Sequence, residues 1–317
     1  MTAPHFPILP TAQDKFIAYL KHYRIWQVQE VLWQWLGAYP MSASALLNQI
    51  DQLKTWLDGF RPLPAAVVAE LRQRYTVRFT YHSNALEGNT LTQSETELVL
   101  TTGITVGGKT LQEHLEVIGH RDAIAYIETL GQQATPIGEW EIRQIHSLIL
   151  RTIAPEEAGN YRRLDVQAAG TGYIYPPHYF LSDLMADFIV WLNSEVAETL
   201  HPVLYAAEVH YRFVSIHPFR DGNGRVGRLL MNLILLRAGY PIVIISTQNR
   251  QQYIEGLVQG QQLNNWRAFN ELIVVETRGS LIEMLSILAT AADSQNKGLP
   301  FYQEILDFLQ KHHSQPS

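Results

Sequence analysis

The chain has 317 residues, 46% hydrophobic and 17% charged, which allows one large domain or two small ones with a sizeable core and excludes a chain disordered by composition. Its most apolar stretch, residues 229–245, is broken by Asn232, Arg237 and Pro241, and cysteine is absent; a membrane span is therefore not expected, disulfides and thiolate chemistry are excluded, and a cytoplasmic location is compatible. The net charge of −6 argues against nucleic acid as the main partner, because phosphate contacts supply most of that affinity.

Apolar residues recur at three- and four-residue spacing along most of the chain, which is typical of amphipathic helices. Two segments, Thr92–Glu95 and Thr110–Glu113, also fit the capping box, in which side chains satisfy the unpaired amides at the start of a helix. We therefore predict a mostly α fold, with further helices at about residues 16–35, 44–60, 65–86, 139–150, 182–192, 202–215, 224–236, 249–258 and 266–288.

Two segments depart from the helical pattern. Residues 166–175 read as a small β-hairpin whose tip is Gly170-Thr171-Gly172, because extended arms flank the glycines and Pro176 and Pro177 follow. The second segment is a loop at 217–224 between two predicted helices. It belongs to a basic stretch, His210 to Tyr240, that carries five arginines against a single aspartate, a local charge of +4. Such a stretch suits a small anionic ligand or a solvated helix face, and charge alone does not choose between them.

The loop and the helix after it hold several residues suited to phosphate chemistry. Pro218 disfavours helical geometry at His217, so the preceding helix should end there and present the histidine as a candidate base. Gly222-Asn223-Gly224 can aim backbone N–H groups inward as an anion nest, and the helix N-terminus that follows favours phosphate. An ordinary histidine cap and an ordinary turn are the bland alternatives.

Three charged side chains complete this segment. Arg225 and Arg228, three residues apart, suit phosphate oxygens through paired hydrogen bonds. Asp221 could hold a Mg²⁺ ion that bridges those phosphates. Two arginines at this spacing often lie on a solvated face, but a base, a carboxylate, a nest and two arginines within twelve residues together favour a phosphate site. We call His217–Arg228 the motif segment.

The motif segment resembles the Fic family signature, HxFx(D/E)GNGRxxR, and matches every specified position. Ala158-Gly159-Asn160-Tyr161-Arg162 and Tyr175-Pro176-Pro177-His178 also resemble family segments around the flap. The resemblance covers about residues 75–290. It implies a Fic-type helical bundle with a β-hairpin flap. The catalytic domain would span 76–292 and include the inhibitory helix end, with an N-terminal helical segment over 1–75 and a C-terminal tail over 293–317.

Family members mostly transfer AMP from ATP to a protein hydroxyl, and the resemblance implies roles for residues here. His217 would be the general base and Asp221 the Mg²⁺ ligand. Gly222, Asn223 and Gly224 would cradle the phosphates, Arg225 and Arg228 would hold the leaving pyrophosphate, Tyr253 would border the adenine, and the flap tip, Gly170, Thr171, Gly172 and Tyr173, would pair with a target segment. Gly224 stands where family members that phosphorylate their targets carry lysine, which favours AMP transfer.

A second motif lies far from the first. Ser83, Glu87 and Gly88 match the family's inhibitory pattern, (S/T)xxxE(G/N), at the end of the helix predicted at 65–86. Taken alone, the segment reads as a helix end with a solvated glutamate and Gly88 as its stop. The resemblance implies instead that Glu87 pairs with Arg228 and denies that arginine to the γ-phosphate.

The resemblance therefore predicts an autoinhibited adenylyltransferase that uses ATP and Mg²⁺ on a Ser, Thr or Tyr of a target protein, or on itself. Two alternatives stay open: removal of AMP by the same site, with Glu87 positioning a water, and a non-catalytic nucleotide-binding module. The remaining histidines show no zinc-ligand spacing, and we read them as surface or packing residues. The target's identity and the formation of a homodimer stay open.

Overall fold

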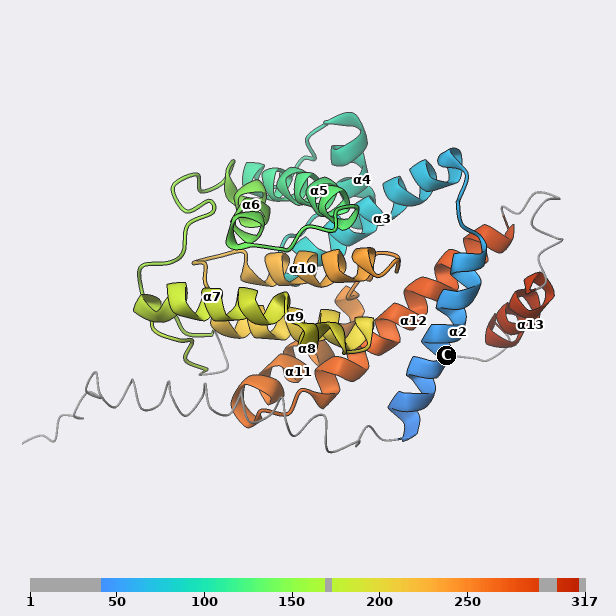
Figure 1. The fold of residues 1–317 in the computed structure, drawn as a ribbon. Coiled ribbons are helices and arrows are strands. Elements are labelled where there is room, and N and C mark those ends of the chain that lie inside the picture. Colours follow the sequence, from blue (N-terminus) through green and yellow to red (C-terminus); the bar gives the residue numbers. More distant parts are fainter. Residues whose placement is uncertain (1–40, 169–172, 291–300, 314–317) are drawn as a thin grey trace, which may run out of the picture. The chain divides into compact units, whose positions relative to one another are not determined.

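The computed structural model describes residues 41–168, 173–290 and 301–313, and Figure 1 shows the order of its elements. The mostly α fold is confirmed, and the helix predicted at 16–35 lies outside the described residues. The helices are α2 (Met41–Gly59), α3 (Ala65–Leu86), α4 (Gln93–Thr102), α5 (Leu111–Gly131), α6 (Glu139–Leu150), α7 (Leu181–Leu192), α8 (Glu195–Glu198), α9 (Pro202–Ile216), α10 (Asn223–Arg237), α11 (Arg250–Leu263), α12 (Arg267–Thr290) and α13 (Tyr302–His313), with short 3₁₀ turns η1 (His178–Phe180) and η2 (Thr247–Asn249).

Both predicted capping boxes are present. The Thr92 side chain accepts from the amide of Glu95 at 3.2 Å, and the Glu95 carboxylate accepts from the amide of Thr92 at 2.7 Å, which starts α4. Thr110 and Glu113 exchange the same two bonds at the start of α5, at 3.2 and 2.8 Å. Helices α4 and α5 therefore begin where the sequence predicts.

Helix α10 lies at the centre of the described helices and packs against α9, α5, α6 and α3 (Figure 1). Every residue from Arg225 to Leu235 is buried. A helix that is buried on all sides needs apolar residues all round, which explains the long apolar run at its C-terminal half. Since the motif segment forms the start of this helix, the core holds it in place.

The chain from Tyr240 to Ile245 is buried without forming helix or a paired strand. Asn232 on α10 supplies hydrogen-bond partners to the backbone of this buried segment. The Asn232 side-chain oxygen accepts from the amide of Val243 at 2.7 Å, and the Asn232 side-chain amide donates to the Val243 carbonyl at 2.9 Å. The polar residue that interrupts the apolar run is thus a buried structural clamp. Within the described ranges, no helix is long and apolar enough to cross a membrane.

The described residues from Ala45 onward form one compact unit. Helix α13 adds Ile305 and Leu309 to the same hydrophobic core, and Phe308 meets Trp56 of α2 edge to face at 5.6 Å. Both helices lie in segments that the resemblance treats as flanking the catalytic domain. The predicted boundaries at 75 and 292 stay a prediction.

The predicted hairpin has adjacent arms. Gln167 and Ile174 form an antiparallel bridge, and the amide of Ala168 donates to the carbonyl of Tyr173 at 2.9 Å. The tip residues Gly170, Thr171 and Gly172 lie outside the described residues. We call residues 164–168 and 173–176 the flap arms.

Candidate active site

The loop of the motif segment takes its shape from two left-handed backbone positions and from the side chain of Asn223. His217 ends α9 in the left-handed region, at φ 53°, and Gly222 precedes α10 with φ 78°, a conformation that favours glycine. Between them, the Asn223 side chain accepts from the amide of Phe219 at 3.0 Å and donates to its carbonyl at 2.8 Å. The Asn223 side chain therefore braces the loop, and only its backbone N–H is left to contribute to an anion nest.

His217 has the protonation state and the tautomer that a base requires. Its Nδ1 donates to the carbonyl of Val214 at 3.4 Å, so the proton lies on Nδ1 and the lone pair on Nε2. Its ring stacks on Tyr175 of the second flap arm, with centroids 3.8 Å apart. Burial lowers the pKa of His217 to about 4, because desolvation disfavours the charged imidazolium. The histidine is therefore neutral at neutral pH.

A second histidine, His146 of α6, contacts the loop through a hydrogen bond and a ring stack. The amide of Gly159 donates to Nδ1 at 2.9 Å, which leaves the proton on Nε2 to donate to the Asp221 carbonyl at 3.0 Å. The ring stacks flat on Phe219 at 3.6 Å, and burial lowers its pKa to about 4. His146 is fully buried and supports the loop through these contacts. From the sequence alone it is predicted only to be a surface or packing residue.

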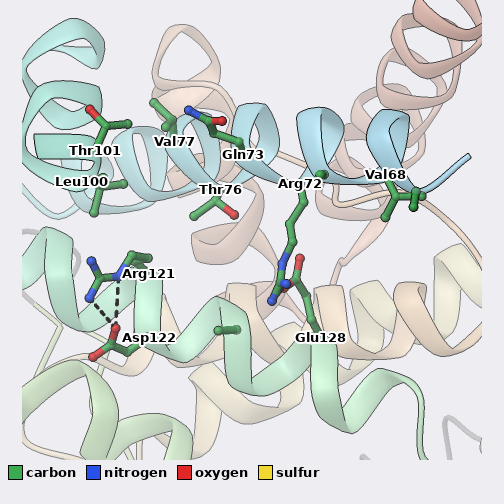
Figure 2. Close-up of a pocket in the computed structure, with 13 residues that line it drawn as sticks. Val68, Arg72, Gln73, Thr76, Val77, Leu100, Thr101, Arg121, Asp122 and Glu128 are labelled. Atoms are coloured by element: carbon green, nitrogen blue, oxygen red, sulfur yellow. Dashed lines mark hydrogen bonds and ion pairs between the residues drawn. The ribbon is translucent and has the colours of Figure 1, made fainter.

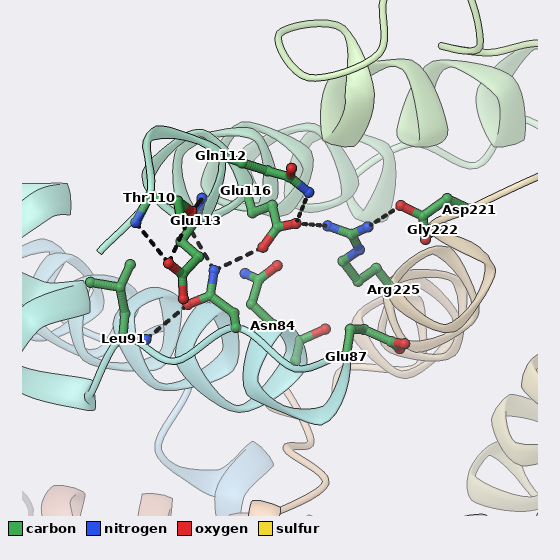
Figure 3. A network of polar contacts seen from close by, with 12 residues as sticks. Asn84, Glu87, Leu91, Thr110, Gln112, Glu113, Glu116, Asp221, Gly222 and Arg225 are labelled. Carbon is green, nitrogen blue, oxygen red and sulfur yellow. Dashed lines mark hydrogen bonds and ion pairs between the residues drawn. The ribbon is translucent and has the colours of Figure 1, made fainter. Parts of the chain in front are cut away.

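Asp221 and Arg225 belong to a polar network that reaches α5 and the turn after α3 (Figure 3). The Asp221 carboxylate accepts from the amide of Gly222 at 2.6 Å and from the Arg225 guanidinium at 3.1 Å. On its other side Arg225 faces Glu116 of α5 at 3.9 Å, and Glu116 in turn accepts from Asn89 at 2.8 Å. The Asp221 side chain is 63% exposed and that of Arg225 only 3%, so Asp221 faces solvent while Arg225 is buried.

Arg228 is the most enclosed charge of the segment. Its side chain is 1% exposed, and Nη2 donates to Glu87 Oε1 at 2.7 Å. Nε donates to the Ser83 hydroxyl at 3.0 Å, and Nη2 also donates to the Ser83 carbonyl at 2.8 Å. Nη1 donates to the Tyr253 hydroxyl at 3.1 Å, and that hydroxyl lies 3.1 Å from His210 Nε2. These bonds use four of the five N–H groups of the guanidinium.

Helix α3 presents Glu87 to this arginine. The helix ends at Leu86, Glu87 caps it, and Gly88 turns the chain away at φ 103°, where a residue with a side chain would be strained. A β-carbon placed on Gly224 would overlap Glu87 Oε1. The glycine at 224 thus makes room for the carboxylate beside the start of α10.

The structure brings most of the predicted site residues together, but in two groups. Arg225 faces Asp221 and α5, whereas Arg228 faces Ser83 and Glu87 of α3. Tyr253 is 3% exposed, with its hydroxyl on Arg228; a place beside the adenine stays a prediction. The functional roles of His217, Asp221 and the nest also stay predictions.

Another cleft, of about 960 Å³, lies between the first half of α3 and helices α4 and α5 (Figure 2). Its walls carry the ion pairs Arg72–Glu128 and Arg121–Asp122. No residue of the motif segment lines it, and Ser83 and Glu87 lie at the opposite end of α3. The candidate active site is therefore the motif segment with the end of α3.

The chain resembles known proteins in sequence and in structure. The profile of the Fic/DOC family matches residues 136–235. The chain is 42% identical over 207 residues to "Protein adenylyltransferase Fic" of Drosophila grimshawi, which covers 65% of this chain and 42% of that protein. It is 37% identical over 274 residues to the protein of the same name from Nematostella vectensis, covering 81% and 63% respectively.

The chain thus spans between about two fifths and two thirds of the length of these curated relatives. Among solved structures, Fic-1 from C. elegans superposes with a TM-score of 0.72 at 30% identity, over 79% of this chain and 74% of that one. With the intact signature at the start of α10, these likenesses establish that the chain belongs to the Fic/DOC family.

Proposed function

We propose that the chain is an autoinhibited protein adenylyltransferase, which transfers AMP from ATP to a Ser, Thr or Tyr hydroxyl of a target protein. The observation that carries the proposal is a neutral, partly buried His217 at the mouth of a loop that ends in the N-terminus of α10. A base beside an anion site is the arrangement that nucleotidyl transfer to a hydroxyl needs. The names of the curated relatives support the same activity.

In this scheme the target hydroxyl oxygen attacks the α-phosphorus of ATP while its proton passes to Nε2 of His217. The bond between the α-phosphorus and the bridging oxygen breaks, and pyrophosphate leaves. Backbone N–H groups of Asn223 and Gly224, at the positive end of the α10 dipole, hold phosphate oxygens. The N–H of Gly222 joins them only after it is released by the Asp221 carboxylate, to which it donates at 2.6 Å. Arg228 offers its guanidinium to the leaving phosphates once Glu87 has withdrawn.

Asp221 fits a magnesium ion. In nucleotide sites Mg²⁺ is held by one or two carboxylates plus phosphate oxygens, and Asp221 is a single carboxylate with a side chain 63% exposed. In the part of the chain that the structure describes, no group of three or more His, Asp or Glu side chains could form a complete protein cage. When bound, the ion supplies positive charge against the phosphate oxygens.

The contact between Glu87 and Arg228 supports autoinhibition. One guanidinium cannot make full contacts with both the Glu87 carboxylate and a γ-phosphate, so the two anions compete for it. Glu87 is also 40% exposed, which leaves it a path out of the site. The flap arms lie beside His217 through Tyr175, a suitable place for an extended target segment to pair with the flap, Tyr173 included.

The test is transfer of label from α-labelled ATP with Mg²⁺ to proteins of a lysate and to the chain itself, with wild type, Glu87→Gly and His217→Ala compared. Label on protein that disappears in His217→Ala supports the proposal. Release of AMP from a pre-labelled protein without new labelling would favour AMP removal. Binding of ATP without any transfer in Glu87→Gly would leave a nucleotide-binding module and refute the proposal.

A further inference from the structure

Arg162 connects the flap to the loop that carries the candidate base. It follows the turn at Gly159, and its side chain is 1% exposed. Nε donates to the carbonyl of His217 at 2.9 Å, Nη1 to that of Leu164 at 2.9 Å, and Nη2 to that of Pro176 at 2.5 Å. Its own amide donates to the carbonyl of Pro218 at 2.9 Å.

These acceptors belong to three different segments. Leu164 begins the first flap arm, Pro176 ends the second, and His217 carries the candidate base. A guanidinium is planar and presents its donors in a rigid fork, whereas an ammonium is a single point. The single guanidinium group of Arg162 therefore fixes the positions of both flap arms relative to His217.

The charge of Arg162 is not explained by ion pairing. Its nearest carboxylate, Asp165, lies at 4.0 Å and is half exposed, while the guanidinium is enclosed by backbone carbonyls. Burial lowers the pKa of Arg162. Burying a charge is costly unless it is well hydrogen-bonded, so the three carbonyls are what stabilise the arginine here, and it in turn orders them.

We propose that Arg162 is a positioning residue for the transfer step. It holds the flap arms in register with His217, so that a hydroxyl on a segment paired with the flap reaches Nε2. Tyr175, one residue before Pro176, reinforces this link by stacking on His217. The inference rests on the proposed function, and it predicts a defect in transfer to protein that spares ATP binding, because the hydrogen bonds of Arg162 run to the flap and to His217–Pro218 and not to α10.

A second contact ties the two ends of the flap together, and its loss can be compared with the loss of Arg162. The Asp165 carboxylate accepts from the amide and the ring Nδ1 of His178, both at 2.9 Å. This contact joins the bases of the two arms but does not reach His217. Loss of Asp165 should therefore loosen the hairpin while leaving the link between flap and base in place.

The experiment compares Arg162→Met, Arg162→Lys and Asp165→Ala in the Glu87→Gly background, with Arg163→Met as the matched control on the exposed neighbouring arginine. Transfer of label from α-labelled ATP and affinity for ATP with Mg²⁺ are measured for each. We expect Arg162→Met to lose about 100-fold in transfer, the effect typical of a misplacement near 1 Å, with ATP affinity unchanged. Arg162→Lys should recover part of the loss, Asp165→Ala should lose less than Arg162→Met, and Arg163→Met should match its parent.

A second readout does not depend on activity. The NMR signal of the His217 imidazole, assigned with His217→Ala, should shift in Arg162→Met because the stacked Tyr175 ring moves, and should stay unchanged in Arg163→Met. If Arg162→Met does not fold, Arg162→Lys carries both measurements. Unchanged transfer and an unmoved His217 signal, or an ATP affinity that falls in parallel with transfer, would overturn the inference. If the Glu87→Gly parent transfers no AMP, the proposed function fails, while the His217 signal still tests the link.

Discussion

Replacing Glu87 by glycine is the sharpest perturbation of this site. The carboxylate lies 2.7 Å from Nη2 of Arg228, whose side chain is 1% exposed, while that of Glu87 is 40% exposed. Two unit charges about 4 Å apart near a protein surface attract by about 4 kcal/mol, and the exposure of Glu87 reduces this through solvent screening. A coupling of about 1–3 kcal/mol remains, so Glu87→Gly should raise AMP transfer by roughly 5- to 150-fold.

The assay is autoradiography with α-labelled ATP and Mg²⁺ on wild type, Glu87→Gly, Arg228→Ala and the double variant. Arg228→Ala and the double variant should both be inactive, because Arg228 is also needed for the phosphates. Glu87→Gln is the matched control for charge: it keeps the side-chain length and should give an intermediate rate. A Glu87→Gly protein no faster than wild type would refute autoinhibition, and a slower one would make Glu87 part of the chemistry and favour AMP removal.

Four further predictions concern the loop. His217→Ala should abolish transfer but keep ATP affinity, and transfer at the wild-type rate would remove the proposed base. Asp221→Ala should depress turnover, with partial rescue by excess Mg²⁺; full activity after chelation by EDTA would contradict a metal role. His146→Ala leaves the Asp221 carbonyl and the Gly159 amide without their partner, and each unsatisfied group costs about 1–3 kcal/mol of folding stability. Urea unfolding should therefore show a clear loss of stability. An unchanged midpoint would mean that the loop is held by other contacts. Because burial lowers the pKa of His146 and of His217 to about 4, the unfolded chain binds more protons between pH 6.5 and 4, and stability should fall by about 1.4 kcal/mol per pH unit for each histidine as the pH drops through that range; equal unfolding midpoints at pH 7 and 5 would contradict this.

Local structure in this protein follows from short-range patterns. The helix predicted at 65–86 has those ends, and the boxes at Thr92 and Thr110 start α4 and α5. Gly88 stops α3, and Pro218 follows the residue at which α9 ends. Each of these features depends on residues within about four positions of one another, so the sequence alone contains the cause.

The family signature reaches further than periodicity does. It singled out the residues at the start of α10 and the end of α3, and it implied the contact between Glu87 and Arg228 that the structure contains. Composition and spacing could not have paired them, because the two residues are 141 positions apart. What the signature does not contain is the division of labour between the arginines, of which Arg225 faces Asp221 and α5.

Only the tertiary structure decided which side chains support the site. His146 belongs to no recognisable motif in the sequence, and Arg162 lies in a segment that resembles the family without indicating a role for the arginine. In the structure, His146 donates to the carbonyl of Asp221 and Arg162 to that of His217. Their partners are backbone groups 75 and 55 residues away, and a backbone carbonyl looks the same at every position of a sequence. Helix packing brings donor and acceptor together, so these supports follow from the fold, while the caps, stops and motif residues follow from the sequence.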